Sequence, residues 1–136
     1  HIVIIGNGIS GVTLARHIRK LSDKRITLIS SESEHFFSRT ALMYVYMGHM
    51  KWNHLKPYED KFWVKNRLEL KQAHVQHVDT QQKQLTFESG EVFSYDKLVI
   101  ACGSKYNKFG WPGQDAKGVI GLVNKQDLEE LEELAP

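Results

Sequence analysis

The fold of this chain is decided by its first eleven residues, HIVIIGNGISG (residues 1–11). The run His1–Ile5 is apolar and largely β-branched, which predicts a parallel strand buried on both faces. From Ile9 to Leu21, apolar residues recur at helical spacing. Residues 25–30 (RITLIS) then form a second apolar run. Residues 1–30 therefore predict a strand–helix–strand unit of the usual size.

The glycines of the Gly-x-Gly-x-x-Gly pattern between strand and helix have separate tasks. Gly6 permits a tight turn, Gly8 lets the backbone approach a pyrophosphate, and Gly11 lets the helix pack closely on the strand. The backbone N–H groups of Ile9 and Ser10 lie at the start of the predicted helix, where the helix dipole favours negative charge. We predict a dinucleotide site at these five residues. A glycine turn that serves only packing is the alternative.

An acidic residue after the second strand usually holds the hydroxyl groups of the adenosine ribose. The strand ends at Ser30, and Ser31 and Glu32 follow it. We predict that Glu32, or Ser31 in its place, holds this ribose; the alternative is an exposed loop carboxylate. No arginine follows immediately to receive a 2′-phosphate, which favours FAD or NAD over NADP.

The remaining chain does not continue with regular strand–helix units, as an NAD domain would. Helices are predicted at residues 38–47, 57–66 and 125–134, the last capped by Asn124. Strand-like segments at residues 68–70, 75–78, 83–87 and 92–94 predict a small antiparallel meander. The apolar run Leu98–Ala101 predicts a return to the parallel sheet. This departure from further strand–helix units favours FAD.

Residues 95–104 (YDKLVIACGS) resemble the second signature of the pyridine nucleotide-disulfide oxidoreductase superfamily of FAD enzymes. That signature is a Tyr-Asp-x-Leu strand ending in Ala-Thr-Gly, matched here by Ala101, Cys102 and Gly103, with Cys in place of Thr. The resemblance covers essentially all 136 residues. It implies an α/β fold, a Rossmann-like FAD-binding module whose parallel sheet carries helices and a small antiparallel β-meander. It also implies FAD as cofactor and NAD(P)H as co-substrate of the parent enzyme.

The resemblance also implies roles for individual residues. The Ala101–Gly103 turn would close over the cofactor near its diphosphate-ribityl part, and the backbone of Val75 would bind adenine. Ser38 and Arg39 resemble a segment of nitrite-reductase-like and ferredoxin-reductase-like members. Arg39 would reach the pyrophosphate or flank the flavin; a surface salt bridge is the alternative.

The single cysteine limits the branch of the family. A dithiol cycle needs a Cys-x4-Cys pair, which is missing, and Arg39 stands where peroxide-reducing members have their cysteine. Cys102 follows an apolar strand and is expected to be a small buried residue. Residues 104–113 resemble type II NADH dehydrogenases, whereas residues 36–43 resemble the nitrite- and ferredoxin-reductase groups. The electron acceptor and the catalytic residues therefore stay open.

The composition limits which classes of partner are expected for this chain. It is 41% hydrophobic and 25% charged, with a formal charge of +2, as in ordinary globular domains. There is no basic stripe with interleaved aromatic residues, so nucleic acid is not expected. We expect no metal site and no membrane span, and a lone cysteine favours the cytoplasm. Peripheral membrane contact of the full-length parent and a homodimer stay open.

Two parts that family members have are not found in this sequence. There is no second glycine fingerprint of an NAD(P) domain, and no later Gly-Asp motif that returns to the FAD. We therefore expect residues 1–136 to be a single, incomplete FAD-binding domain that is inactive alone. The alternatives are an NAD-binding dehydrogenase fragment and a non-catalytic nucleotide-binding module that docks partners through the acidic residues 127–133.

Overall fold

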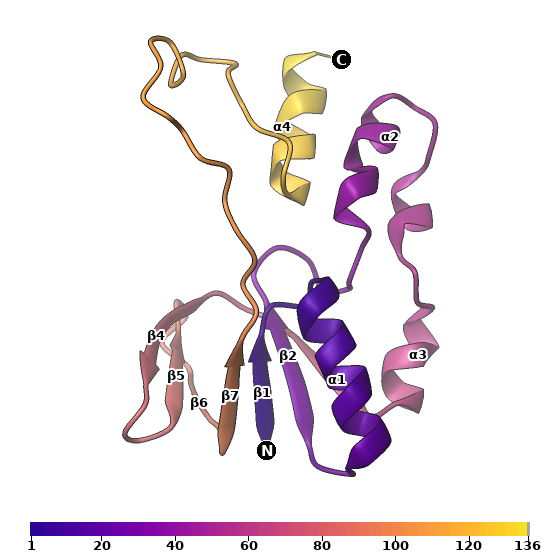
Figure 1. The fold of residues 1–136 in the computed structure, drawn as a ribbon, viewed down its shortest axis with the longest axis vertical. Coiled ribbons are helices and arrows are strands. Elements are labelled where there is room, and N and C mark those ends of the chain that lie inside the picture. The colour runs from indigo at the N-terminus through magenta and orange to yellow at the C-terminus, as the bar shows by residue number, and fades with distance from the viewer. Residues whose placement is uncertain (136) are drawn as a thin grey trace. The chain divides into compact units, whose positions relative to one another are not determined.

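The computed structural model describes residues 1–135, which divide into two compact units (Figure 1). The first unit comprises His1–Phe36 and Tyr58–Gly103. The second comprises Phe37–Pro57 and the described residues from Ser104 onward. Each unit has its own cluster of buried apolar side chains.

A four-stranded parallel sheet forms the centre of the first unit. Its strands lie in the order β3-β2-β1-β7. They are β1 (Ile2–Ile5), β2 (Ile26–Ser30), β3 (Leu68–Gln72) and β7 (Lys97–Ile100). Ile2 aligns with Ile26 of β2 on one side and with Lys97 of β7 on the other. All four carboxyl ends therefore lie at one edge of the sheet.

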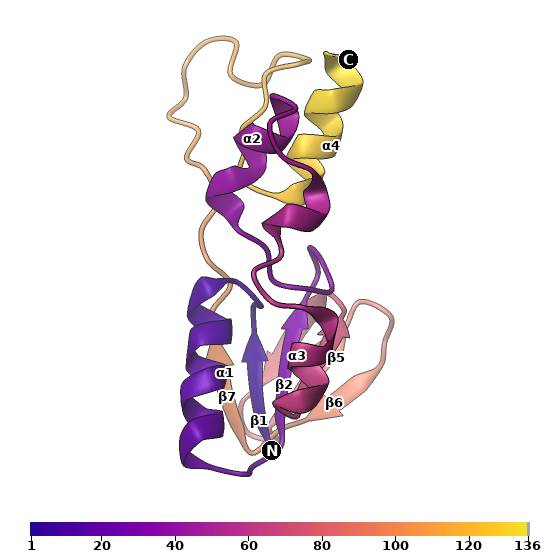
Figure 2. The ribbon, with the colours of Figure 1, turned by 90° about the vertical axis from the view of Figure 1, so that its right-hand side faces the viewer.

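Two helices cover one face of this sheet, α1 (Ile9–Leu21) and α3 (Asp60–Lys65) (Figure 2). Ile4 and Leu28 point from β1 and β2 to this side and pack with Ala15 of α1 and Trp63 of α3. The predicted helical stripe is confirmed in its middle, since Val12 and Ala15 are buried. Its ends are exposed, because the sheet is shorter than the helix.

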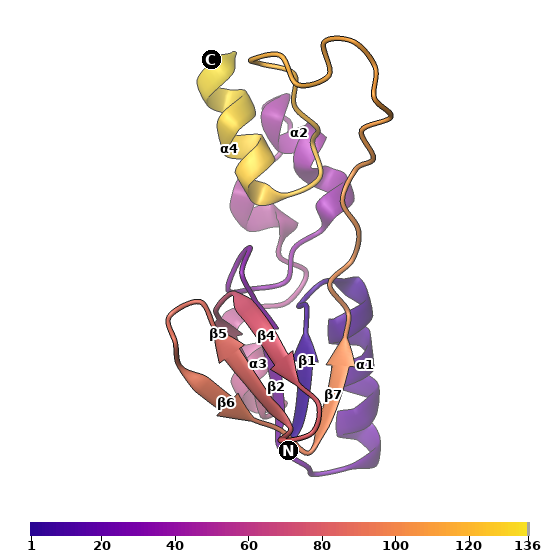
Figure 3. The same cartoon turned by 90° about the vertical axis from the view of Figure 1, so that its left-hand side faces the viewer.

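An antiparallel sheet covers the opposite face (Figure 3). Its strands, in the order β4-β5-β6, are β4 (Val75–Asp79), β5 (Gln84–Phe87) and β6 (Val92–Ser94). Val3 and Ile29 point to this side and pack with Leu85 and Phe87. Successive residues of a strand face opposite ways, so β1 supplies Ile4 to the helices and Val3 to the meander.

One assignment from the sequence is wrong. The segment that begins at Leu68 was expected in the meander, but it forms β3 and pairs in parallel with β2. A parallel partner requires a crossover connection, and the chain between the two strands supplies one. Its helix α3 packs Phe62 and Trp63 against the same core as Leu68. The meander therefore has three strands, and the parallel sheet gains a fourth.

The second unit is helical. Its elements are the 3-10 helices η1 (Arg39–Ala41) and η2 (Trp52–Leu55) and the α-helices α2 (Leu42–Tyr46) and α4 (Lys125–Leu134). Their core consists of Phe37, Leu42, Leu55 and Leu128. The helices predicted at 38–47 and 57–66 are present but shorter, and η2 was not predicted. Within residues 1–135, no helix is long and apolar enough to cross a bilayer.

The predicted cap of the last helix is confirmed. The Asn124 side chain accepts a hydrogen bond from the Asp127 backbone N–H at 2.8 Å, and the Asp127 carboxylate accepts one from the Asn124 N–H at 2.9 Å. This reciprocal capping box satisfies two helix-end donors. Asn124 is therefore the N-cap residue of α4.

Candidate dinucleotide site

The fold itself requires two of the three fingerprint glycines. Gly6 has a φ of +113°, and a Cβ there would lie 2.1 Å from the Ala101 carbonyl oxygen. A Cβ on Gly11 would lie 2.0 Å from the Gly6 carbonyl oxygen. Both contacts are with backbone, which cannot move aside cheaply. Gly6 and Gly11 therefore allow strand, turn and helix to pack, whether or not a ligand is bound.

Gly8 is different. Its φ of −71° and ψ of −175° are extended values that any residue can adopt. A Cβ added at Gly8 would meet no atom within 4 Å. Folding therefore gives no reason for glycine at this position. A ligand that approaches the backbone closely does give one, since a Cβ would fill that space.

The start of α1 is suited to an anion. Gly8 is the N-cap residue, and its carbonyl accepts the Val12 N–H at 3.0 Å. Within residues 1–135, no side chain caps this helix, and its first turn carries no acid. The N–H groups of Ile9, Ser10 and Gly11 precede the first helical hydrogen bond. The last turn carries Arg19 and Lys20, which complement the negative end of the helix dipole.

Backbone hydrogen bonds hold the segments around the phosphate loop together. The Gly6 N–H donates to the Ile29 carbonyl at 2.7 Å, and the Ala101 N–H donates to the Ile5 carbonyl at 2.7 Å. The segments that follow β1, β2 and β7 therefore meet at the carboxyl edge of the sheet. In open α/β sheets this edge is where ligands bind.

Asn7 is a site residue that the sequence did not single out. Its side chain is buried, and its Nδ2 donates to the carbonyls of Ser33 at 2.8 Å and Glu34 at 3.2 Å. These bonds join the phosphate loop to the segment after β2. Asn7 occupies a variable position of the fingerprint, so the motif gave no signal. Its only sequence signal was a polar side chain between two glycines of the fingerprint.

The structure places the predicted ribose ligands at this edge. Ser31 is exposed and Glu32 half-buried, and both directly follow β2. The Glu32 N–H donates to the Ser30 hydroxyl at 3.2 Å. Val75 begins β4 and is paired with Phe87 of β5. The ligand contacts of Ser31, Glu32 and Val75 stay predictions.

Cys102 is exposed, so the expectation that it is buried is wrong. The reason is the position of β7, which is an edge strand whose Ile100 is itself 68% exposed. Cys102 lies just beyond that strand, with its Sγ 3.8 Å from the Ile5 carbonyl oxygen. Gly103 follows with a φ of +71°, a left-handed value that favours glycine. Ala101, by contrast, is half-buried against the core.

Ser38 and Arg39 belong to the second unit, in contrast to the other predicted ligands. The Ser38 N–H donates to the Leu55 carbonyl at 2.8 Å. The Arg39 guanidinium lies 5.3 Å from the centre of the Phe37 ring and donates to the Val123 carbonyl. Both residues thus have partners within their own unit, and their cofactor contacts stay predictions.

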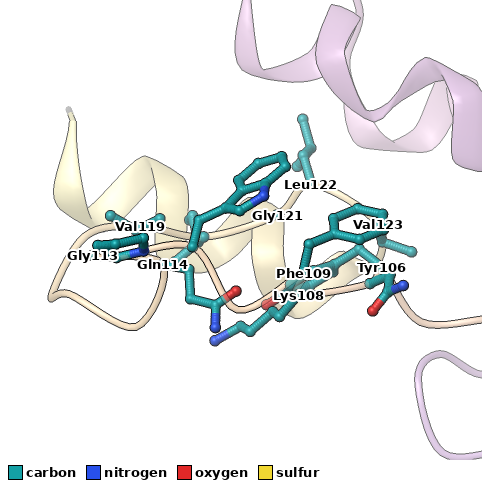
Figure 4. Close-up of a pocket in the computed structure, with 13 residues that line it drawn as sticks. Tyr106, Lys108, Phe109, Gly113, Gln114, Val119, Gly121, Leu122 and Val123 are labelled. Atoms are coloured by element: carbon teal, nitrogen blue, oxygen red, sulfur yellow. The ribbon is translucent and has the colours of Figure 1, made fainter.

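The second unit also contains an open hollow of about 430 Å³ between residues 106 and 123 (Figure 4). Aromatic side chains line it, with the rings of Phe109 and Trp111 stacked at 5.4 Å. The Tyr106 ring occupies the place of a side chain at Gly121, where a Cβ would lie 2.7 Å from it. The lining is mostly apolar. Elsewhere in residues 1–135, no group of three His, Cys, Asp or Glu side chains is arranged to hold a metal ion.

Known proteins resemble this chain over nearly its full length. Residues 1–134 match the family model described as pyridine nucleotide-disulphide oxidoreductase. The ferredoxin–NAD(+) reductase subunit of a benzene 1,2-dioxygenase system from Pseudomonas putida is 30% identical over 96% of this chain and 32% of its own length. The sulfide-quinone reductase of Aquifex aeolicus is 30% identical over 98% of this chain and 31% of its own length.

Solved structures of such oxidoreductases also resemble this chain. The crystal structure of NADH:rubredoxin oxidoreductase from Clostridium acetobutylicum superposes with a TM-score of 0.84 and 26% identity, over 97% of this chain and 34% of that one. The chain thus spans about a third of the length of these relatives. Members of the family bind FAD and use NAD(P)H. The glycine fingerprint, the fold of the first unit and the match over residues 1–134 show that the chain belongs to the pyridine nucleotide-disulphide oxidoreductase family.

Proposed function

We propose that this chain binds FAD, with its pyrophosphate on the loop from Gly6 to Gly11. The observation that carries the proposal is the contrast among the three glycines. Gly6 and Gly11 are required by packing, whereas the space beside Gly8 is open. The uncapped start of α1 adds backbone donors and a favourable dipole at the same place.

The rest of the carboxyl edge is assigned to the adenosine and ribityl parts of FAD. Glu32, or Ser31 in its place, accepts hydrogen bonds from the ribose hydroxyls, and the Val75 backbone binds adenine. The Ala101–Gly103 turn lies over the diphosphate-ribityl region. These assignments rest on chain positions relative to β2, β4 and β7. The Ser38–Arg39 pair is assigned to the pyrophosphate or the flavin edge.

The parent activity that we propose is an NAD(P)H-dependent oxidoreductase that passes electrons through FAD to an acceptor. Bound flavin supplies the electron-transfer chemistry, and the protein binds and orients it. With one cysteine in the sequence, no dithiol pair takes part within this chain. The relatives are named for ferredoxin, rubredoxin and quinone partners. These names differ at similar identity, so they do not single out one acceptor for this chain.

Residues 1–136 are assigned, within that parent, to the N-terminal portion of the FAD-binding domain. The support is the extent of the similarity, which covers 96% of this chain but 32% of the Pseudomonas putida ferredoxin–NAD(+) reductase subunit. A cytoplasmic location is part of the same proposal, because a single cysteine suits a reducing compartment.

An absorbance spectrum of the purified chain, taken after incubation with excess FAD and desalting, tests the proposal. Retained visible flavin bands at one FAD per chain would support it. A colourless protein would contradict FAD binding by this chain. A parallel NAD titration addresses the NAD-fragment alternative, which predicts saturable NAD binding and no flavin uptake.

A further inference from the structure

The loop after β2 has no regular secondary structure, yet side chains hold it in place. Two serine hydroxyls, one from the end of β2 and one from the loop itself, take part in its local hydrogen bonds. The Ser30 hydroxyl accepts the Glu32 N–H at 3.2 Å, and the Ser33 hydroxyl donates to the His35 carbonyl at 2.9 Å. These contacts shape the loop locally. They do not position it against the phosphate loop.

The Asn7 side chain makes that connection. Its Nδ2 reaches the Ser33 and Glu34 carbonyls across 26 and 27 residues of sequence. Asn7 is only 7% exposed, and Ser33 only 9%. A buried carbonyl without a donor is costly, so the bond to the Ser33 carbonyl favours one position of the loop. A carboxamide suits the task because its single nitrogen carries two N–H donors and no charge.

The neighbours of Asn7 are themselves fixed. Gly6 is held against Ala101 on one side, and Gly8 begins α1 on the other. The Asn7 backbone therefore has a defined position, from which the side chain determines where the Ser31–Glu34 loop lies. Glu32 is within that loop, one residue before the first carbonyl that Asn7 binds.

We propose that Asn7 is a positioning residue, which sets the distance between the pyrophosphate loop and the ribose-binding segment at Ser31 and Glu32. This inference rests on the proposed FAD site. It assigns Asn7 no contact with the nucleotide. Its effect is on the ribose end of the ligand, while the phosphate end depends on Gly8 and the start of α1.

The test compares ADP with 2′-deoxy-ADP, by calorimetric titration of the wild-type chain and Asn7→Ala. The exposed Asn53 provides a matched control, Asn53→Ala. We expect the wild type and the control to prefer ADP by about tenfold or more, the value of one hydrogen bond to a charged group. In Asn7→Ala, ADP binding weakens about tenfold and the preference falls to near one. If Asn7→Ala does not fold, Asn7→Ser is used, which keeps a polar but shorter side chain.

A second readout needs no nucleotide. Amide hydrogen exchange of residues 31–35 should become at least about tenfold faster in the Asn7 variant, while α1 keeps its protection. A variant that weakens ADP and 2′-deoxy-ADP equally, or that leaves exchange unchanged, overturns the positioning role. If the wild type binds neither FAD nor ADP, the proposed function fails and the inference falls with it. If the wild type binds both and only the Asn7 effect is missing, the inference alone fails.

Discussion

Substitution of Gly8 separates ligand binding from folding. In Gly8→Val the new side chain enters open space, since no atom lies within 4 Å of the Cβ position. The backbone at Gly8 already has extended angles that valine adopts. Loss of a favourable N-cap costs about 0.5–1 kcal/mol, and reduced freedom of the unfolded chain offsets about 0.4–1 kcal/mol. We therefore expect the free energy of unfolding to change by less than about 1 kcal/mol.

Binding should change far more. The valine side chain would occupy the space through which a pyrophosphate approaches the N-terminus of α1. Hydrogen bonds to a charged group contribute about 1.5–3 kcal/mol each. Loss of two such bonds is about 3–6 kcal/mol, which weakens FAD binding by roughly a hundredfold or more.

The assay pairs a flavin fluorescence titration with urea unfolding of each variant. Gly6→Ala and Gly11→Ala are the comparison variants, because their Cβ atoms would lie 2.1 and 2.0 Å from backbone oxygens. Each should lose more than about 3 kcal/mol of stability through steric strain. FAD affinity within threefold of wild type in a folded Gly8→Val variant would refute the pyrophosphate role. Wild-type stability in Gly6→Ala would refute the packing argument.

Three further predictions concern separate parts of the chain. The exposed Cys102 thiol should react readily with iodoacetamide in the free chain and at least about tenfold more slowly in the presence of saturating FAD. Mass spectrometry follows the reaction. Equal rates with and without FAD would mean that the cofactor does not cover this turn. The hydrogen bond from Arg25 holds the pKa of the Glu69 carboxyl below its usual range, so its stabilisation is present at neutral pH and is lost as the pH falls through that lowered pKa. The pair is solvent-exposed, so Glu69→Gln should remove less than about 1 kcal/mol at pH 7 and reduce the acid dependence in urea unfolding; an unchanged acid dependence would contradict this. Leu128 is 3% exposed in the core of the second unit, so Leu128→Ala should lower the stability of that unit by about 2–4 kcal/mol. Amide exchange should become faster in α2 and α4 and stay unchanged in β1 and β2. An equal loss of protection across the whole chain would show that the two units unfold together.

The features that were predicted correctly depend on neighbouring residues. Apolar runs identified β1, β2 and β7, and helical spacing identified α1. The Asn124 cap was predicted because its partner lies only three residues away. The glycine fingerprint predicted the turn between β1 and α1, where the backbone of Gly6 blocks a Cβ at Gly11 and both residues are close in sequence.

The features that were missed depend on contacts between distant residues. The segment from Leu68 alternates like a meander strand, and only its parallel pairing with β2 and its packing with α3 place it in the parallel sheet. Cys102 follows an apolar run, but that run lies at the edge of the sheet, so the thiol is exposed.

The sequence by itself determined the strand–glycine–helix unit and its capacity for a dinucleotide, because backbone sterics and residue periodicity are local properties. Only the tertiary structure decided which glycines packing requires, since the Cβ positions of Gly6 and Gly11 are blocked by backbone oxygens and that of Gly8 is open. It also decided the hydrogen bonds of Asn7, whose partners lie 26 and 27 residues away. A hydrogen bond across that separation exists only after β1 and β2 have paired and brought their carboxyl ends together.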